Sequence, residues 1–128
     1  MNIDINPDTV CFLINKAHEF HGQEQVTISE MPDSPSNDLA QQALADHVND
    51  PTYQEMANTI EDLEPDQQIC LVALMWLGRG DFSLDEWDEA LGQAADAYNN
   101  RTASYLIATP LLADYLQEGL ALHEYFCE

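Results

Sequence analysis

Two pairs of residues have the spacing of metal ligands on a helix. His18 and His21 lie three residues apart, and His123 and Cys127 lie four apart, so a helix would place each pair on one face. Zinc accepts both imidazole and thiolate as ligands. Because nothing in the sequence brings the two pairs together, we interpret them as solvated histidines near a helix end and a terminal thiol. We therefore expect no metal and no cofactor.

The segment from Gly80 to Trp87 resembles the second half of a calcium-binding EF-hand loop, with Glu86 as its twelfth-position ligand. Such a loop also needs oxygen ligands at its first, third and fifth positions, which fall here on Met75, Leu77 and Arg79. None of these side chains carries an oxygen. We therefore predict a helix–loop–helix corner and no calcium site.

Basic residues are so scarce that each is a candidate for a defined role. The chain has three of them, Lys16, Arg79 and Arg101. Arg79 follows an apolar run, at the negative end of a predicted helix dipole, where a cation is stabilised. We expect Arg79 and Arg101 each to pair with an Asp or Glu and to tie two elements together. In the alternative interpretation they bind an anion. The candidate interaction or ligand residues are Arg79, Asp81, Glu86, Trp87 and Arg101.

The cysteines and the missing motifs argue against catalysis. Cys11, Cys70 and Cys127 are an odd number scattered along the chain, which is not typical of a disulfide framework. Cys11 and Cys70 lie among apolar residues, where a buried thiol is usually inert packing. The chain also lacks a nucleophile elbow, a phosphate-cradling glycine loop and a paired histidine–glutamate zinc motif. We predict no catalytic residue and a reduced, cytoplasmic protein, and we favour a protein that is not an enzyme.

Acidic residues dominate the charge. The chain has 24 Asp and Glu against three Lys and Arg, and its formal net charge is −21 over 128 residues. Such a surface repels nucleic acid and anionic lipid, and it favours basic proteins and speeds their encounter. The longest apolar run, nine residues from Ile69 to Leu77, is shorter than the roughly 20 that span a membrane. No basic region followed by an apolar stretch opens the chain, so we expect no secretory signal.

The apolar periodicity predicts an all-α fold. We expect one compact domain over residues 1–128, a bundle of about six or seven helices around the run at 69–77, which has no polar face. A long loop is expected at about 23–37, after a stop at Gly22. The last helix should run through Leu112 to Phe126, or it forms one helix with 103–108 that is kinked at Pro110. Expected helix starts are Asn6-Pro7, Asn37, Asp50-Pro51, Pro65, Ser83, Thr102 and Thr109-Pro110.

Several blocks of sequence, spread over most of the chain, form a further pattern. They are Val10–Ile14 with Lys16–Phe20, Asp50–Tyr53, Trp76–Asp81 with Glu86-Trp87, Arg101–Leu106, and Thr109–Leu116. Together they resemble a bacterial family of domains of unknown function, number 3775. The resemblance implies a bacterial, helical, cytoplasmic protein. It supplies no activity, so no catalytic residue is carried over.

Two hypotheses about function follow. In the first, the chain is a non-enzymatic interaction protein that engages a basic protein, for example as a DNA mimic whose carboxylates imitate phosphates. In the second, it is a small ligand-binding or enzymatic domain with a pocket near Arg79, Trp87 and Arg101. The acidity could equally be a solvated face or an adaptation to a salty cytoplasm. Oligomeric state and partner identity stay open. The acidic clusters are Glu61, Asp62, Glu64 and Asp66, and then Asp81, Asp85, Glu86, Asp88 and Glu89.

Overall fold

The longest apolar run of the sequence forms most of helix α4 (Pro65–Arg79). In the computed structural model, which describes residues 3, 5–21, 49–99, 101–109 and 111–127, every residue from Cys70 to Leu77 is buried. Helix α4 packs most extensively against α7 (Leu112–Leu122) and next against α5 (Trp87–Ala97). A helix without a polar face needs neighbours on all sides, and the prediction of a central helix at 69–77 is confirmed.

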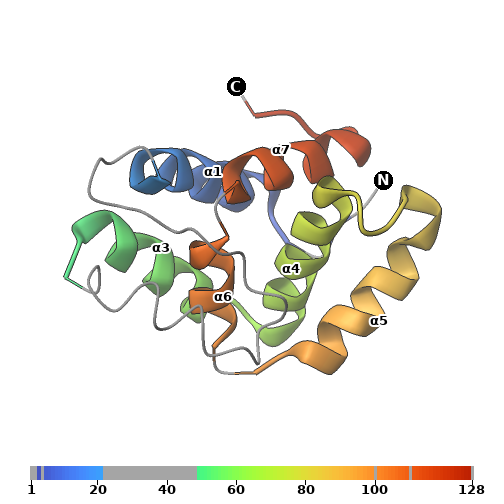
Figure 1. The fold of residues 1–128 in the computed structure, drawn as a ribbon, viewed down its shortest axis with the longest axis horizontal. Helices are drawn as coiled ribbons and strands as arrows, with labels where there is room; N and C mark the ends of the chain where they lie inside the picture. The colour runs from blue at the N-terminus through green and yellow to red at the C-terminus, as the bar shows by residue number, and fades with distance from the viewer. Residues whose placement is uncertain (1–2, 4, 22–48, 100, 110, 128) are drawn as a thin grey trace.

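The remaining described helices are α1 (Pro7–His21), α3 (Pro51–Asp62) and α6 (Thr102–Ala108), and a short 3-10 turn, η2 (Leu84–Glu86), leads into α5. Helix α1 packs against α7 and α3, and α3 packs against α6. Figure 1 shows α5 at the outer edge of the molecule, beyond α4. The parts of the chain that the structure describes contain no strand, so the prediction of a compact all-α fold is confirmed.

Local capping explains where α1 and α3 begin and where α4 ends. The side chain of Asn6 accepts a hydrogen bond from the Asp8 backbone N–H at 2.9 Å, and Asp50 accepts one from the Thr52 N–H at 2.7 Å. Both bonds satisfy N–H groups that have no partner inside the helix. Helix α4 ends because Gly80 adopts a left-handed conformation (φ 95°), which glycine reaches without steric cost. These predicted boundaries are confirmed.

Helices α4 and α7 approach closely because each carries a glycine at their crossing. A Cβ atom on Gly78 would overlap the carbonyl oxygen of Tyr115, and one on Gly119 would overlap the carbonyl oxygen of Leu74. Backbone therefore lies directly against backbone at this point. Any larger residue would have to push the two helices apart.

Helix α6 begins at Thr102 as predicted, but the predicted cap there and the predicted start of α7 are wrong. The side chain of Thr102 does not cap α6; it lies inside the first turn, and its hydroxyl donates to the Asn99 carbonyl oxygen at 2.9 Å. The hydroxyl of Thr109 donates back to the Tyr105 carbonyl oxygen at 3.0 Å, so α7 begins later, at Leu112. Threonine hydroxyls readily bond the carbonyl four residues earlier, which competes with capping. Helices α6 and α7 are separate, with Thr109 extended between them.

The end of α7 also differs from the prediction. The helix stops at Leu122 instead of running to Phe126. Glu124 adopts φ 67°, which lets the Tyr125 N–H donate to the Leu120 carbonyl oxygen at 2.9 Å. This arrangement satisfies carbonyls that the helix end leaves open. The predicted stop at Gly22, loop at 23–37 and helix from Asn37 lie outside the described residues.

Candidate functional site

Arg79 belongs to a polar cluster at the end of α4. Its Nε donates to Asp81 Oδ2 at 2.7 Å across the helix terminus. Burial is the largest single influence and works against the charged form, but the hydrogen bonds and charge interactions with Asp81 and Tyr105 together outweigh it, and the pKa of Arg79 is raised. The predicted pairing of this arginine with a carboxylate is confirmed. The pair fixes the corner that follows Gly80.

The same cluster ties α4 to α6. Trp76 is 8% exposed, and its indole Nε1 donates to the Tyr105 hydroxyl at 2.7 Å. Burial raises the pKa of Tyr105 above its ordinary value, although the bond from Trp76 and the charge of Arg79 work in the opposite direction. The ring of Phe82 lies 6.1 Å from that of Trp76, measured between centroids. This buried donor–acceptor pair gives the indole N–H a partner that an apolar core would not provide.

Glu86 and Trp87 have structural contacts of their own. Glu86 Oε1 accepts from the Ser83 N–H at 2.9 Å and from its hydroxyl at 3.2 Å, which is the predicted capping box. The box opens η2, and α5 follows at Trp87. The Trp87 ring packs edge-to-face on His123, with centroids 4.4 Å apart.

The five candidate residues do not converge on one point. Arg79 and Asp81 are in contact, and Glu86 and Trp87 are neighbours at the start of α5. Arg101 lies at the other end of α5, four residues after its last residue, Ala97, where its N–H donates to Asn99 Oδ1 at 2.7 Å. Since α5 has 11 residues, about 16 Å of helix separates Trp87 from the turn that carries Arg101.

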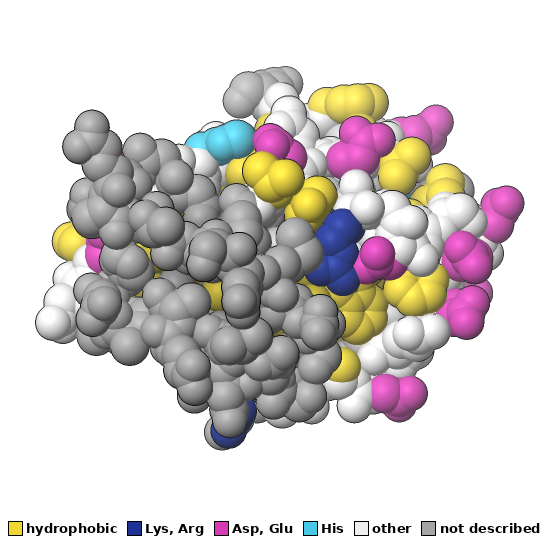
Figure 2. Space-filling model, in the orientation of Figure 1, with side chains coloured by type: hydrophobic (Ala, Val, Ile, Leu, Met, Phe, Trp, Pro, Cys, Tyr) yellow, Lys and Arg dark blue, Asp and Glu magenta, His cyan; other side chains and the backbone are white. Residues whose placement is uncertain are grey.

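The carboxylates of η2 and α5 form the acidic face of the molecule, which we define as Asp85, Glu86, Asp88, Glu89 and Asp96. All five side chains are exposed, whereas Ala90 and Ala94 on the opposite side of α5 are buried. Figure 2 shows acidic side chains spread over the side of the molecule that carries α5 in Figure 1. Alternation of buried alanines and exposed acids is what an amphipathic surface helix requires.

Lys16 forms its ion pairs elsewhere in the fold. Lys16 Nζ lies 2.6 Å from a carboxylate oxygen of Glu55 and 3.4 Å from one of Glu19. The hydrogen bond to Glu55 is the main cause of a raised pKa for Lys16, which stays cationic. Lys16 therefore links α1 to α3.

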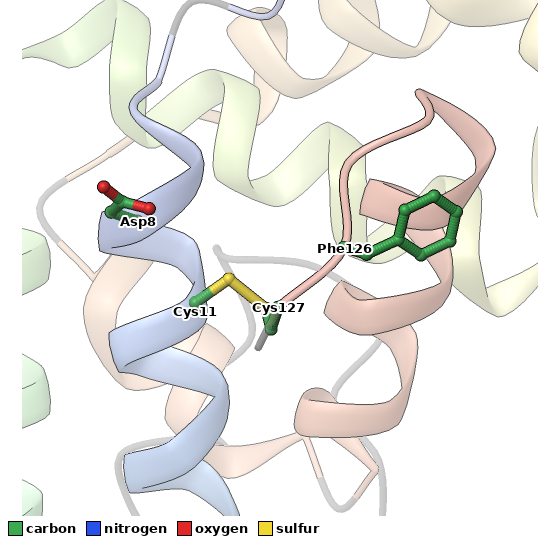
Figure 3. Close-up of a pocket in the computed structure, with 4 residues that line it drawn as sticks. All are labelled: Asp8, Cys11, Phe126 and Cys127. Atoms are coloured by element: carbon green, nitrogen blue, oxygen red, sulfur yellow. A yellow bond between two sulfur atoms is a disulfide. The ribbon is translucent and has the colours of Figure 1, made fainter.

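Sequence reasoning missed a disulfide. Cys11 on α1 is bonded to Cys127, with Cα atoms 5.6 Å apart and a sequence separation of 116 (Figure 3). The expectation of no disulfide, with Cys11 as buried packing, is wrong, because the fold brings the segment after α7 back beside α1. Cys70 is buried within α4, as predicted. An odd number of cysteines still allows one pair, so the count of three was compatible with a single disulfide.

The disulfide also removes one of the proposed metal-ligand pairs. The Cys127 sulfur is bonded to Cys11, and the segment that carries it is no longer helical, so His123 and Cys127 do not share a helix face. His123 is 2% exposed, not solvated, and burial lowers its pKa. Among the described residues, no group of three His, Cys, Asp or Glu side chains is placed to hold a metal ion.

Beside the disulfide the surface is hollowed. A cavity of about 390 Å³ is lined by Asp8, Cys11, Phe126 and Cys127. Figure 3 shows the S–S bond bridging α1 and the segment after α7, with the Phe126 ring turned away from it.

In the described part of the chain, no helix is long and apolar enough to cross a membrane.

A family model described as a protein of unknown function (DUF3775) matches residues 53–125. The chain belongs to the DUF3775 family. No curated protein and no solved structure matches it. In this DUF3775 member, the matched range holds the α4–α7 crossing, the Arg79 cluster and the acidic face, whereas Cys11 and Cys127 both fall outside it.

Proposed function

We propose that this protein is a non-enzymatic bacterial interaction protein, whose acidic face binds a basic protein. The observation that supports this most is the set of exposed carboxylates on η2 and α5, at the outer edge of the molecule. A chain with a net charge of −21 attracts cationic surfaces over a long range and speeds their encounter.

The stability of α5 does not account for all of these acids. Carboxylates in the first turn of a helix complement its positive end, and Glu86 completes the capping box, so Asp88 and Glu89 have a structural use. Asp96 lies in the last turn, where a negative charge is unfavourable. Asp96 thus adds a carboxylate of the acidic face at the far end of α5, at some cost to the helix itself. This charge is not explained by the stability of the helix, and a role in binding would explain it.

The sharper version of this proposal is that the basic partner is a nucleic-acid-binding protein and that the acidic face imitates phosphates. Lys and Arg clusters that bind phosphate would bind these carboxylates by the same electrostatics. In that case double-stranded DNA should compete with this protein for the partner. A basic partner that DNA does not displace would support the general proposal and exclude the mimic.

The alternative, a small ligand-binding or enzymatic domain with a pocket near Arg79, Trp87 and Arg101, has less support. Arg79 is engaged with Asp81, and Trp87 and Arg101 lie toward opposite ends of α5. The cavity described above lies beside Cys11 and Cys127 instead.

A cytoplasmic location is likewise a proposal. The cysteines no longer favour the cytoplasm, because Cys11 and Cys127 form a disulfide and stable disulfides are typical of oxidising compartments. Trapping the thiols of the protein in intact cells with an alkylating agent would test it. A mostly reduced Cys11 supports the cytoplasm, and a fully bonded one supports an oxidising compartment.

Affinity capture with two matched variants tests the main proposal. The face variant carries D85N, D88N, E89Q and D96N and keeps Glu86 for the capping box. The control variant carries E61Q, D62N, D66N and E118Q, all at exposed positions. Each removes four of the 24 acids, so the two have the same net charge. We expect wild type and control to capture the same basic protein and the face variant to lose it. Equal capture by both variants would contradict a role for this face.

A further inference from the structure

We propose that the Cys11–Cys127 disulfide is a redox-sensitive tether, which holds the segment 124–127 against α1 and releases it on reduction. This inference is independent of the proposed binding function. It rests on the position of the two sulfurs, on how the segment is held, and on the charge that surrounds the bond.

The disulfide is accessible to a reductant in the folded protein. Cys11 and Cys127 are both half-buried, and both line the cavity of about 390 Å³ at the surface (Figure 3). Cys70, in contrast, is 0% exposed within α4. Thiol–disulfide exchange needs access of the attacking thiolate to a sulfur, so Cys11 and Cys127 can react without unfolding, and Cys70 cannot.

The disulfide is the covalent link between α1 and the segment beyond α7. Helix α7 ends at Leu122, and Glu124 turns the chain out of the helix with φ 67°. Tyr125 is half-buried against the core and its N–H donates to the Leu120 carbonyl oxygen, whereas Phe126, next to Cys127, is 76% exposed and contributes little to the core. The packing of α1 against α7 is made by the helices themselves and does not require the disulfide. Opening the bond should therefore free the segment while the helices stay packed.

The reaction balances with a dithiol as reductant. One thiolate of the dithiol attacks a sulfur of the pair, the Cys11–Cys127 bond breaks, and the other sulfur leaves as a thiolate that takes up a proton. The second thiol of the reductant then displaces the remaining protein sulfur from the mixed disulfide. Two electrons pass to the protein, which gains two thiols, and the dithiol becomes a disulfide.

The surroundings select the reductant by charge. The Asp8 carboxylate lines the same cavity, and the whole chain carries a net charge of −21. An anionic thiol such as glutathione is repelled, whereas an uncharged dithiol such as dithiothreitol is not. Salt should accelerate reduction by glutathione, because it screens this repulsion, and should leave reduction by dithiothreitol almost unchanged. D8N should accelerate the glutathione reaction specifically.

The first experiment measures release of the segment in the native protein. The oxidised full chain is treated with dithiothreitol without denaturant, thiols are counted by alkylation and mass spectrometry, and brief chymotrypsin digestion probes cleavage after Tyr125 and Phe126. We expect two new thiols and at least a tenfold faster cleavage, with the helical circular dichroism retained. C11S should be cleaved fast without reductant, and C70A should respond as wild type does.

Three results would overturn the proposal. The bond could resist dithiothreitol until the protein is denatured, which would make it a buried structural crosslink. Reduction could leave the cleavage rate unchanged, which would mean that packing alone holds the segment. Reduction could also abolish the helical signal, which would make the disulfide a requirement for the fold. Because reduction of wild type is measured directly, the test does not depend on whether C11S folds.

Discussion

Helices α4 and α5 lie side by side in this protein but obey different constraints. Eight consecutive residues of α4, from Cys70 to Leu77, are buried, and its crossing with α7 leaves no room for a Cβ atom at Gly78. Helix α5 buries Ala90 and Ala94 and exposes the carboxylates of the acidic face. Substitutions in α4 should therefore alter folding, whereas substitutions on the exposed side of α5 should alter binding with little effect on the fold.

The largest effect is expected at the α4–α7 crossing. G78A places a methyl group on the Tyr115 carbonyl oxygen, so the helices must separate, and we expect a loss of more than about 4 kcal/mol or failure to fold. Urea unfolding followed by circular dichroism measures this.

Gly92 on α5 provides the matched control, because no atom lies within 4 Å of an added Cβ. G92A should stabilise the protein by about 0.5–1 kcal/mol, since alanine favours a helix over glycine. Equal effects of the two substitutions would remove the distinction between the helices.

The next largest effect is expected from W76A. The indole is 8% exposed and donates to the Tyr105 hydroxyl, so its removal leaves a cavity and deletes that buried hydrogen bond. We expect a loss of about 3–5 kcal/mol in the free energy of unfolding. W87A, on a half-buried tryptophan at the start of α5, should cost less than W76A in the same urea titration. A larger loss for W87A would place the critical packing in α5.

These two helices also show how far the sequence predicts the structure. Helix α4 was predictable because an uninterrupted apolar run permits no exposed face, and because Pro65 and Gly80 mark its ends. The Arg79–Asp81 pair was predictable because it is local. The Trp87–His123 contact was not, since it depends on how α7 crosses α4.

The disulfide and the end of α7 could not be predicted for a related reason. Cys11 and Cys127 are 116 residues apart, and only the packing of α1 on α7 brings them together. After α7, Glu124 adopts a left-handed conformation that is usually taken by glycine, so the residue type at this position does not predict the end of the helix. Residue types mark the starts of α1, α3 and α4, whereas neither the start nor the stop of α7 follows the residue types at its ends.

A smaller effect is expected at the capping box that opens η2 and α5. S83A removes the hydroxyl that bonds Glu86 but leaves the Ser83 N–H bond to the same carboxylate. We expect a loss of about 1 kcal/mol, measured by thermal unfolding. E86Q keeps an acceptor oxygen and should cost less than S83A, whereas a greater cost for E86Q would mean that the charge itself holds the turn.

His123 connects the two regions, because it follows α7 and packs on Trp87. Burial lowers its pKa, so the unfolded chain takes up a proton at a higher pH than the folded chain does. The stability that depends on neutral His123 is complete above the unfolded pKa of about 6.5 and is lost as the pH falls toward the folded pKa.

Urea unfolding of wild type and H123L at about pH 8 and about pH 5.5 isolates this effect, because the carboxylates are common to both proteins. Relative to H123L, wild type should have a smaller free energy of unfolding at the lower pH than at the higher pH. An unchanged difference would show that folding does not shift the pKa of His123.

The most direct test of the acidic face is the association rate of the captured partner, measured by stopped-flow against sodium chloride concentration. The face variant and the control variant carry the same net charge and should melt within a few degrees of wild type, since the substituted side chains are exposed. We predict that association with wild type and control slows steeply as salt rises, because long-range attraction is screened. At low salt the face variant should associate at least tenfold more slowly than wild type, and its association rate should depend less on salt. Equal rates for the two variants, or a rate for wild type that salt does not change, would contradict binding through the acidic face.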